Sequence, residues 1–251
     1  MRKLLWMLCS ILFTHTLTAQ DFSNKGKDFY LCFPQHVQSG TSYATLSLWI
    51  TSDKPSSGTV TMGNGAFSAT FNIAANGIQE IQVPYSAAHI SNAESNTVIR
   101  KSIRVRVDAG KAPVVAYAQQ WGAARSAASL LLPVNVLGKK YYAISFTQNG
   151  SNSGQIVARS QFQIVAVANN TLITITPRKN GVLQTPVNVS LPLAGDVYQY
   201  QSTDPNANSQ DLSGTFIESI ASGTGSCLPI AVFSGSSNLS IGTTTCSATS
   251  Y

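Results

Sequence analysis

Nearly every periodic segment of this chain alternates between apolar and polar residues. Alternation with a period of two is typical of β-strands that have one buried face. Gly, Asn, Ser and Pro separate the segments and favour turns. The alternating segments are residues 44–51, 59–62, 69–73, 78–83, 102–107, 114–119, 129–134, 141–146, 162–167, 172–176, 187–191, 197–201, 216–220 and 230–233. No segment keeps a helical period, although 85–95 has room for one helical turn, so the sequence predicts an all-β fold.

The two halves of the chain also match each other in order. Residues 26–30, 64–65, 72–73 and 113–117 correspond to residues 138–142, 180–181, 188–189 and 229–233, and 59–61 parallel 173–175. Ordered matches of this kind predict an internal duplication. Each unit has room for seven or eight short strands, which favours two tandem, related β-sandwich domains. A single barrel or propeller-like β-domain is the alternative.

The N-terminus has the features of a secretory signal. Arg2 and Lys3 precede an apolar run over residues 4–13, which is too short to span a bilayer, and Ala19 provides a small residue for cleavage. We therefore predict a signal peptide at residues 1–19, a first unit at 20–137 and a second at 138–251. No later run is apolar enough for a membrane span, so the protein is expected to be secreted or exposed on the cell surface.

The second unit is predicted to lack its last strand. The segment that follows Phe233 is rich in Ser, Thr and Gly and has no counterpart of residues 130–134. A missing strand would leave the backbone groups of a neighbouring strand unpaired. We therefore expect the chain to be part of a longer multidomain protein, with a truncated gene product as the alternative.

Charge is sparse. Only 10% of residues are charged, and removing Arg2 and Lys3 from a net charge of +6 leaves +4. This balance is too mild and too scattered to indicate nucleic-acid binding. The basic cluster consists of Arg100, Lys101, Arg104, Arg106 and Lys111. Arg104 and Arg106 alternate with apolar residues, which favours a solvated strand face over a patch for acidic glycans.

Three cysteines follow the predicted signal. The segment 234–238 has the composition of a turn, and a hairpin centred on residues 236–237 would place Cys227 opposite Cys246. We predict a disulfide between these two residues, because an exported chain folds in an oxidising compartment. Cys32 lies in an apolar segment and is predicted to be a buried free thiol.

Residues that could carry chemistry are few. His36 and His89 have no second ligand at metal-binding spacing, and no nucleophile elbow, zinc-protease motif or phosphate loop occurs. Oxygen-bearing side chains alternate at Asp204, Asn206, Asn208 and Asp211, a calcium-loop pattern that lacks its glycine and closing glutamate. A polar loop is the preferred interpretation, so no cofactor is expected, with calcium as the alternative. The aromatic residues Trp49, Trp121, Tyr198 and Tyr200 either line a glycan surface or pack within the sandwiches.

Several motifs resemble a known family. These motifs are Leu132-Pro133-Val134, residues 137–142, residues 162–166, Gly195-Asp196-Val197, residues 211–215 and residues 229–235. From Gly26 onwards the chain is similar to the N-terminal region of IgGFc-binding proteins, in the form found in large exported proteins of Bacteroidetes-type bacteria. The resemblance implies an extracellular binding or adhesion module that takes a protein or a glycan, but no ligand-contacting residue can be transferred.

The sequence thus predicts a non-catalytic extracellular binding module and not an enzyme. The alternative is a secreted glycoside hydrolase whose site is assembled from two distant carboxylates. Such a site needs two carboxyl groups within about 5–10 Å of each other in a cleft.

Overall fold

The computed structural model describes residues 23–36, 44–122, 125–145, 159–203, 210–221, 225–237, 240–241 and 249–250. The signal peptide predicted at residues 1–19 lies outside the described residues. Antiparallel strands dominate the described chain, and none of the sheets they form closes into a barrel. The all-β prediction is therefore confirmed.

The first half of the chain forms two four-stranded sheets that face each other. One has the order β1-β7-β3-β4, with β1 (Asp28–Leu31), β7 (Ile103–Val107), β3 (Ser56–Met62) and β4 (Ser68–Ile73). The other has the order β5-β2-β8-β9, with β5 (Gly77–Val83), β2 (Thr45–Ser52), β8 (Val115–Gly122) and β9 (Arg125–Leu130). Between them lies an apolar core that includes Phe29, Leu48, Phe71 and Val105.

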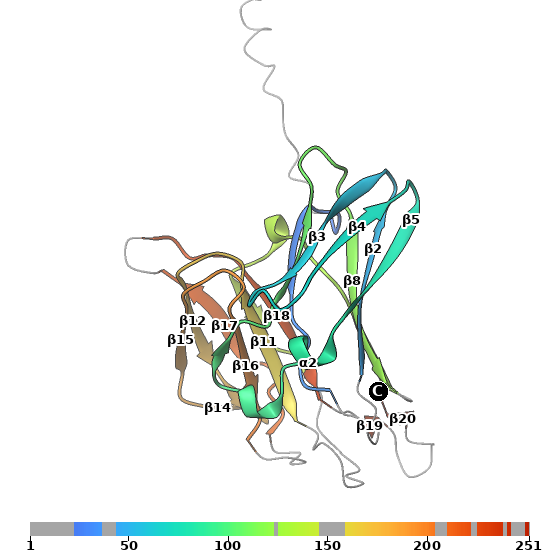
Figure 1. Cartoon of the computed structure of the whole chain (residues 1–251). Coiled ribbons are helices and arrows are strands. Elements are labelled where there is room, and N and C mark those ends of the chain that lie inside the picture. The colour runs from blue at the N-terminus through green and yellow to red at the C-terminus, as the bar shows by residue number, and fades with distance from the viewer. Residues whose placement is uncertain are drawn as a thin grey trace, which may run out of the picture.

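The second half lies beside the first and also contains two four-stranded sheets (Figure 1). One has the order β10-β17-β12-β15, with β10 (Lys140–Tyr142), β17 (Phe216–Ile220), β12 (Thr171–Thr176) and β15 (Val187–Leu191). The other has the order β18-β11-β16-β6, with β18 (Ile230–Ser236), β11 (Ser160–Ala166), β16 (Val197–Gln201) and β6 (Val98–Ile99). Its core includes Phe162, Ile164, Ile173 and Ile217.

The two halves share one strand order. β10-β17-β12-β15 repeats β1-β7-β3-β4 in chain order, and β16-β11-β18 repeats β5-β2-β8. The differences are at the edges, since β9 covers β8 in the first half and β6, from the first half of the chain, extends the second-half sheet beside β16. The predicted boundary between residues 137 and 138 and the missing last strand stay predictions.

The remaining elements are short. β13 (Arg178–Lys179) and β14 (Val182–Leu183) form a hairpin, and β19 (Ser240–Ile241) pairs with β20 (Thr249–Ser250). Asn180 and Gly181 both have positive φ, 48° and 79°, which a type I′ turn requires. A helical turn, α2 (Tyr85–Ala88), and two 3-10 turns, η1 (Asn92–Glu94) and η2 (Val134–Val136), complete the described fold.

Two details of the sequence prediction are wrong. The turn predicted at 234–238 starts too early, because pairing with β11 carries β18 on to Ser236. The match of residues 59–61 with 173–175 is displaced by one residue, because Val60 is buried whereas Thr174, its supposed counterpart, is half-buried. A displacement by one residue would turn every side chain to the other face of the sheet.

A separate apolar cluster joins the two halves. Tyr30 and Cys32 from the first half pack with Val165, Val197 and Ala231 from the second. Every residue of β11 is buried, because one of its faces lines the second-half core and the other faces the first half. The halves are therefore held together in part by an apolar contact.

Candidate binding surface and pocket

The outer face of the β5-β2-β8-β9 sheet carries large exposed side chains. Alternation along β8 turns its alanines into the core and Tyr117 and Trp121 outward. Tyr117 lies opposite Trp49 on β2 and Leu130 on β9. Tyr117 is 40% exposed, Trp121 45% and Leu130 40%. We call these four residues the aromatic face.

One ring of the aromatic face is fixed in place. The indole Nε1–H of Trp49 donates a 2.9 Å hydrogen bond to Oε1 of Gln119, which lies on β8 between Tyr117 and Trp121. A ring that is already held loses little side-chain entropy when a ligand covers it. The face is therefore partly organised for binding before a ligand arrives.

The four aromatic residues for which the sequence left open a glycan surface or packing within the sandwiches do not lie together. Trp49 and Trp121 share the aromatic face, but Tyr198 is 6% exposed and belongs to the second-half core. Tyr200 stacks on Phe162 with ring centroids 5.2 Å apart. Tyr117 was not singled out from the sequence, although the alternation in β8 places it on the same face as Trp121.

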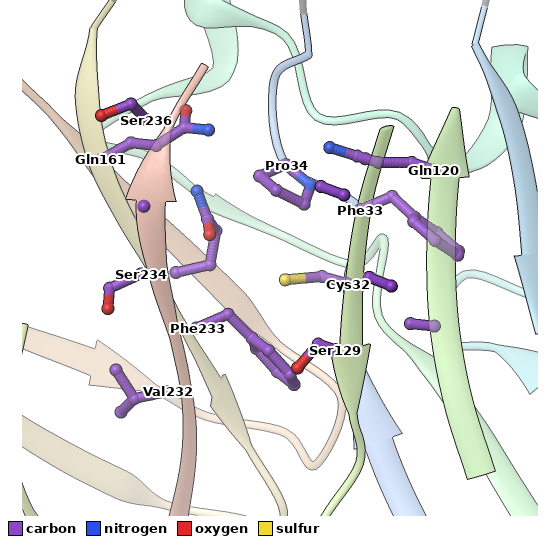
Figure 2. A pocket seen from close by; sticks show the side chains of 15 residues that line it. Cys32, Phe33, Pro34, Gln120, Ser129, Gln161, Val232, Phe233, Ser234 and Ser236 are labelled. Atoms are coloured by element: carbon purple, nitrogen blue, oxygen red, sulfur yellow. The ribbon is translucent and has the colours of Figure 1, made fainter. Parts of the chain in front are cut away.

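A pocket of about 310 Å³ lies between the two halves (Figure 2). Residues 32–34 after β1 contribute to its lining, as do β8 and β9 from the first half and β11 and β18 from the second. Cys32 and Phe233 supply apolar surface, and Gln120 extends from β8 towards Pro34. No charged side chain is among the described residues that line it.

Buried glutamines form the polar side of the contact between the halves. Gln161 and Gln163 on β11 lie opposite Gln201 and Gln199 on β16. Nε2 of Gln163 donates to Oε1 of Gln199 at 2.9 Å, and Nε2 of Gln201 donates to Oε1 of Gln161 at 2.7 Å. Gln120 differs from these four, because its Oε1 is buried and has no hydrogen-bond partner among the described residues. A buried acceptor without a partner is costly.

The predicted basic cluster is largely engaged in ion pairs. Three pairs occur: Arg104 with Asp28, Arg100 with Asp196, and Lys101 with Glu94. Arg104 makes two hydrogen bonds to the Asp28 carboxylate, of 2.8 and 2.6 Å, and these raise the pKa of Arg104. Arg106 is exposed, as expected for a solvated strand face, whereas Arg104 lies over the Tyr30 ring.

Neither histidine belongs to a cluster of potential metal ligands among the described residues. His89 stacks on Tyr85 with ring centroids 4.3 Å apart, and burial together with nearby Lys101 lowers the pKa of His89 to about 4. His36 is 7% exposed. A neutral, half-buried His89 therefore has a packing role here.

Most of the calcium-loop candidate lies outside the described residues. Asp204, Asn206 and Asn208 are not described, whereas Asp211 accepts hydrogen bonds from Ser145 and Ser213. Cys246 is also outside the described residues, so the disulfide with the half-buried Cys227 stays a prediction. Cys32 is buried, and burial raises the pKa of its thiol strongly.

The chain was compared with known proteins. Residues 127–250, from β9 to β20, match the family model described as IgGFc binding protein. This half of the chain is therefore similar to the IgGFc-binding protein family. The resemblance to this family was inferred from Gly26 onwards, and the family model matches the second half of the chain and most of β9. No curated protein and no solved structure matches the chain. Within the described part of the chain, no helix has the length and apolar character that crossing a membrane requires.

Proposed function

We propose that this protein is an exported, non-catalytic module that binds an extracellular protein on its aromatic face. The observation that carries the proposal is the exposure of Trp121, Tyr117 and Leu130 side by side on one sheet. Large aromatic side chains are enriched in protein interfaces and dominate their energetics. The match of residues 127–250 to the IgGFc-binding family model supports a protein ligand.

The surroundings of the aromatic face suit a protein ligand. Gln119 occupies its centre and Glu80 lies across from Trp49 on β5, so polar groups surround the rings. An apolar centre with polar neighbours is the usual arrangement of a protein-binding patch. The hydrolase alternative has no support, because no Asp or Glu is among the described residues that line the pocket.

Binding can be measured by biolayer interferometry with immobilised protein and three probes: human immunoglobulin G Fc fragment, purified mucin and a panel of free glycans. We expect a protein probe to bind, and the double variant Tyr117→Ala/Trp121→Ala to lose at least tenfold in affinity, since interface aromatics cost about 2 kcal/mol or more when truncated. The matched control is Leu183→Ala, which removes an exposed apolar side chain from the β13–β14 hairpin.

Two results would contradict the proposal. Equal affinity in the double variant and the control would move the site away from the aromatic face. Binding of free glycans with no binding of protein probes would show that the ligand is a glycan and not a protein.

A further inference from the structure

The pocket between the halves is bordered by two edge strands. β9 ends the order β5-β2-β8-β9, and β18 ends the order β18-β11-β16-β6. Three successive residues of β9, 127–129, and five successive residues of β18, 232–236, line the pocket. Successive side chains of a strand point to opposite faces. Because residues with side chains on either face of these strands line the pocket, the edges of β9 and β18, with their backbone groups, border it (Figure 2).

The hydrogen-bond pattern gives the direction of these backbone groups. The N–H of Ser237 donates to the carbonyl of Arg159 at 2.9 Å, so this pair is hydrogen-bonded and the bonding alternates along β18. The backbone groups of Val232 and Ser234 therefore point away from β11, towards the edge of β18 that no described strand covers. On β9, the bond from Leu131 N–H to the Ala116 carbonyl, 2.9 Å, likewise turns Ala128 outward.

The first half shows what such an edge accepts. β18 occupies the position in its sheet that β8 occupies in the first-half sheet, and β8 is covered on the corresponding side by β9. The middle of β9 is Ser126-Ala127-Ala128-Ser129, a neutral segment of small residues. An extended segment of this chemistry therefore already pairs with the equivalent edge in the same molecule.

The pocket itself favours an uncharged occupant. Its described lining has no charged side chain, and Gln120 is 7% exposed with an Oε1 atom that lacks a partner. A backbone N–H from an incoming strand would supply the missing donor. A volume of about 310 Å³ lies at the low end of the range for ligand pockets, about 300–1,000 Å³, and suits a few residues of extended chain.

We propose that the pocket is a second binding site, which takes a short, uncharged, extended segment of a partner polypeptide as an added strand on the edge of β18. Main-chain hydrogen bonds to an exposed sheet edge supply the affinity in this mode of recognition. Gln120 accepts a hydrogen bond from the segment, and the small residues around the pocket admit it. The site is separate from the aromatic face, although β8 and β9 contribute to both.

The probe is a capped peptide with the sequence of residues 126–130, titrated into the whole protein and followed by isothermal calorimetry and NMR. We expect saturable binding that Ser234→Pro weakens by roughly tenfold or more, because proline removes the outward N–H while an edge strand tolerates it. Ser234→Ala is the matched control. Both variants lose the hydrogen bond that the Ser234 hydroxyl accepts from Ile144 N–H, but only alanine keeps the backbone donor.

A second pair of variants fills the pocket. A Cβ at Gly235 would meet no atom within 4 Å, so a side chain added there starts in open space beside the pocket. Gly235→Trp should abolish peptide binding, whereas Gly235→Ala should change it by less than about threefold. Thermal melts of all four variants show whether a loss of binding is only a loss of folding.

The proposal would be overturned if the peptide showed no saturable binding, or if Ser234→Pro and Ser234→Ala bound it with equal affinity. A concentration-dependent dimer that only Ser234→Pro dissociates would also overturn it, because the occupant of the site would then be a second copy of the chain. Peptide binding should persist in Tyr117→Ala/Trp121→Ala. Failure of the aromatic face as a site and failure of the strand-addition site are therefore seen in different experiments.

Discussion

Arg100 of the first half donates a hydrogen bond of 2.9 Å to the carboxylate of Asp196 in the second half. The Asp196 side chain is 5% exposed, whereas that of Arg100 is 38% exposed. The same carboxylate accepts the N–H of Leu193, and Arg100 also donates to the carbonyl of Gly63. This ion pair ties the β3–β4 turn to the segment before β16.

Removal of the arginine should therefore loosen the contact between the halves. We expect Arg100→Met to lower the free energy of unfolding by about 2 kcal/mol, because a buried carboxylate loses its cation while solvent still reaches one side of the pair. The exposed Arg106→Met is the control and should change stability by less than about 0.5 kcal/mol. Urea unfolding monitored by circular dichroism measures both, and equal values would contradict the role given to Arg100.

Much of the fold could be predicted because its signals are local. Alternation over residues such as Ile103 to Val107 depends only on one buried face, and Asn180-Gly181 forms a turn through its own backbone preferences. The turn predicted after Phe233 was wrong, because pairing with β11 outweighed the turn preference of Ser and Gly. Local composition competes with long-range pairing at such positions.

The pocket could not be predicted in the same way. It brings Gln120 together with Gln161 and Phe233, and no local pattern links these positions. β6 could not be predicted from the sequence pattern either, because its two residues, Val98 and Ile99, are too few to show a period. Of the aromatic face, the sequence identifies Trp49 and Trp121 as candidate surface residues but does not identify Tyr117.

The stability of the protein should depend on the protonation of His89. The folded state lowers the pKa of His89 to about 4 from an ordinary value of 6.5, through burial and then the charge of Lys101, with Glu94 acting in the opposite direction and His36 adding to the lowering. The unfolded chain thus binds the proton first as the pH falls. Stability contributed by neutral His89 is complete above pH 6.5 and is lost as the pH falls towards 4.

We expect the free energy of unfolding to drop by about 2 kcal/mol between pH 7 and pH 4.5 through this group. His89→Phe keeps the ring stacked on Tyr85 and removes the titration, so its pH profile should be flatter than that of the wild type over this window. Parallel profiles in the two proteins would show that His89 does not titrate as described.

The cysteines give a redox prediction. Cys32 is 4% exposed within the contact between the halves, so Cys227 and Cys246 remain as the pair for a disulfide in an oxidising compartment. Mass spectrometry of a non-reduced digest should find the two linked. Cys227→Ser should then lower stability by roughly 3 kcal/mol under oxidising conditions and by little in the presence of reductant. Two free thiols in the oxidised protein would refute the bond.

Replacement of a buried glutamine by leucine should have opposite effects on stability at two positions, Gln199 and Gln120. Gln199 is fully buried, and its amide accepts from Gln163 and donates to the Ser95 hydroxyl and the Ser91 carbonyl. Gln199→Leu removes these three hydrogen bonds inside the contact and takes from the Gln163 amide the acceptor that it has in Gln199, and we expect a loss of about 2–4 kcal/mol in the free energy of unfolding. Faster amide exchange over residues 91–96 should accompany it, because this segment is held to β16 through Gln199.

Gln120→Leu should have the opposite effect on the free protein. The Oε1 atom of Gln120 is buried without a partner among the described residues, so replacement by an apolar side chain of similar size relieves a desolvation cost and should raise the melting temperature. The same variant should bind the peptide of residues 126–130 more weakly, because the acceptor for the incoming strand is gone. If Gln120 served only in packing, its replacement by leucine would not both raise the melting temperature and weaken peptide binding. If Gln120→Leu destabilises the protein as Gln199→Leu does, then Gln120 is part of the structural network and does not serve the pocket.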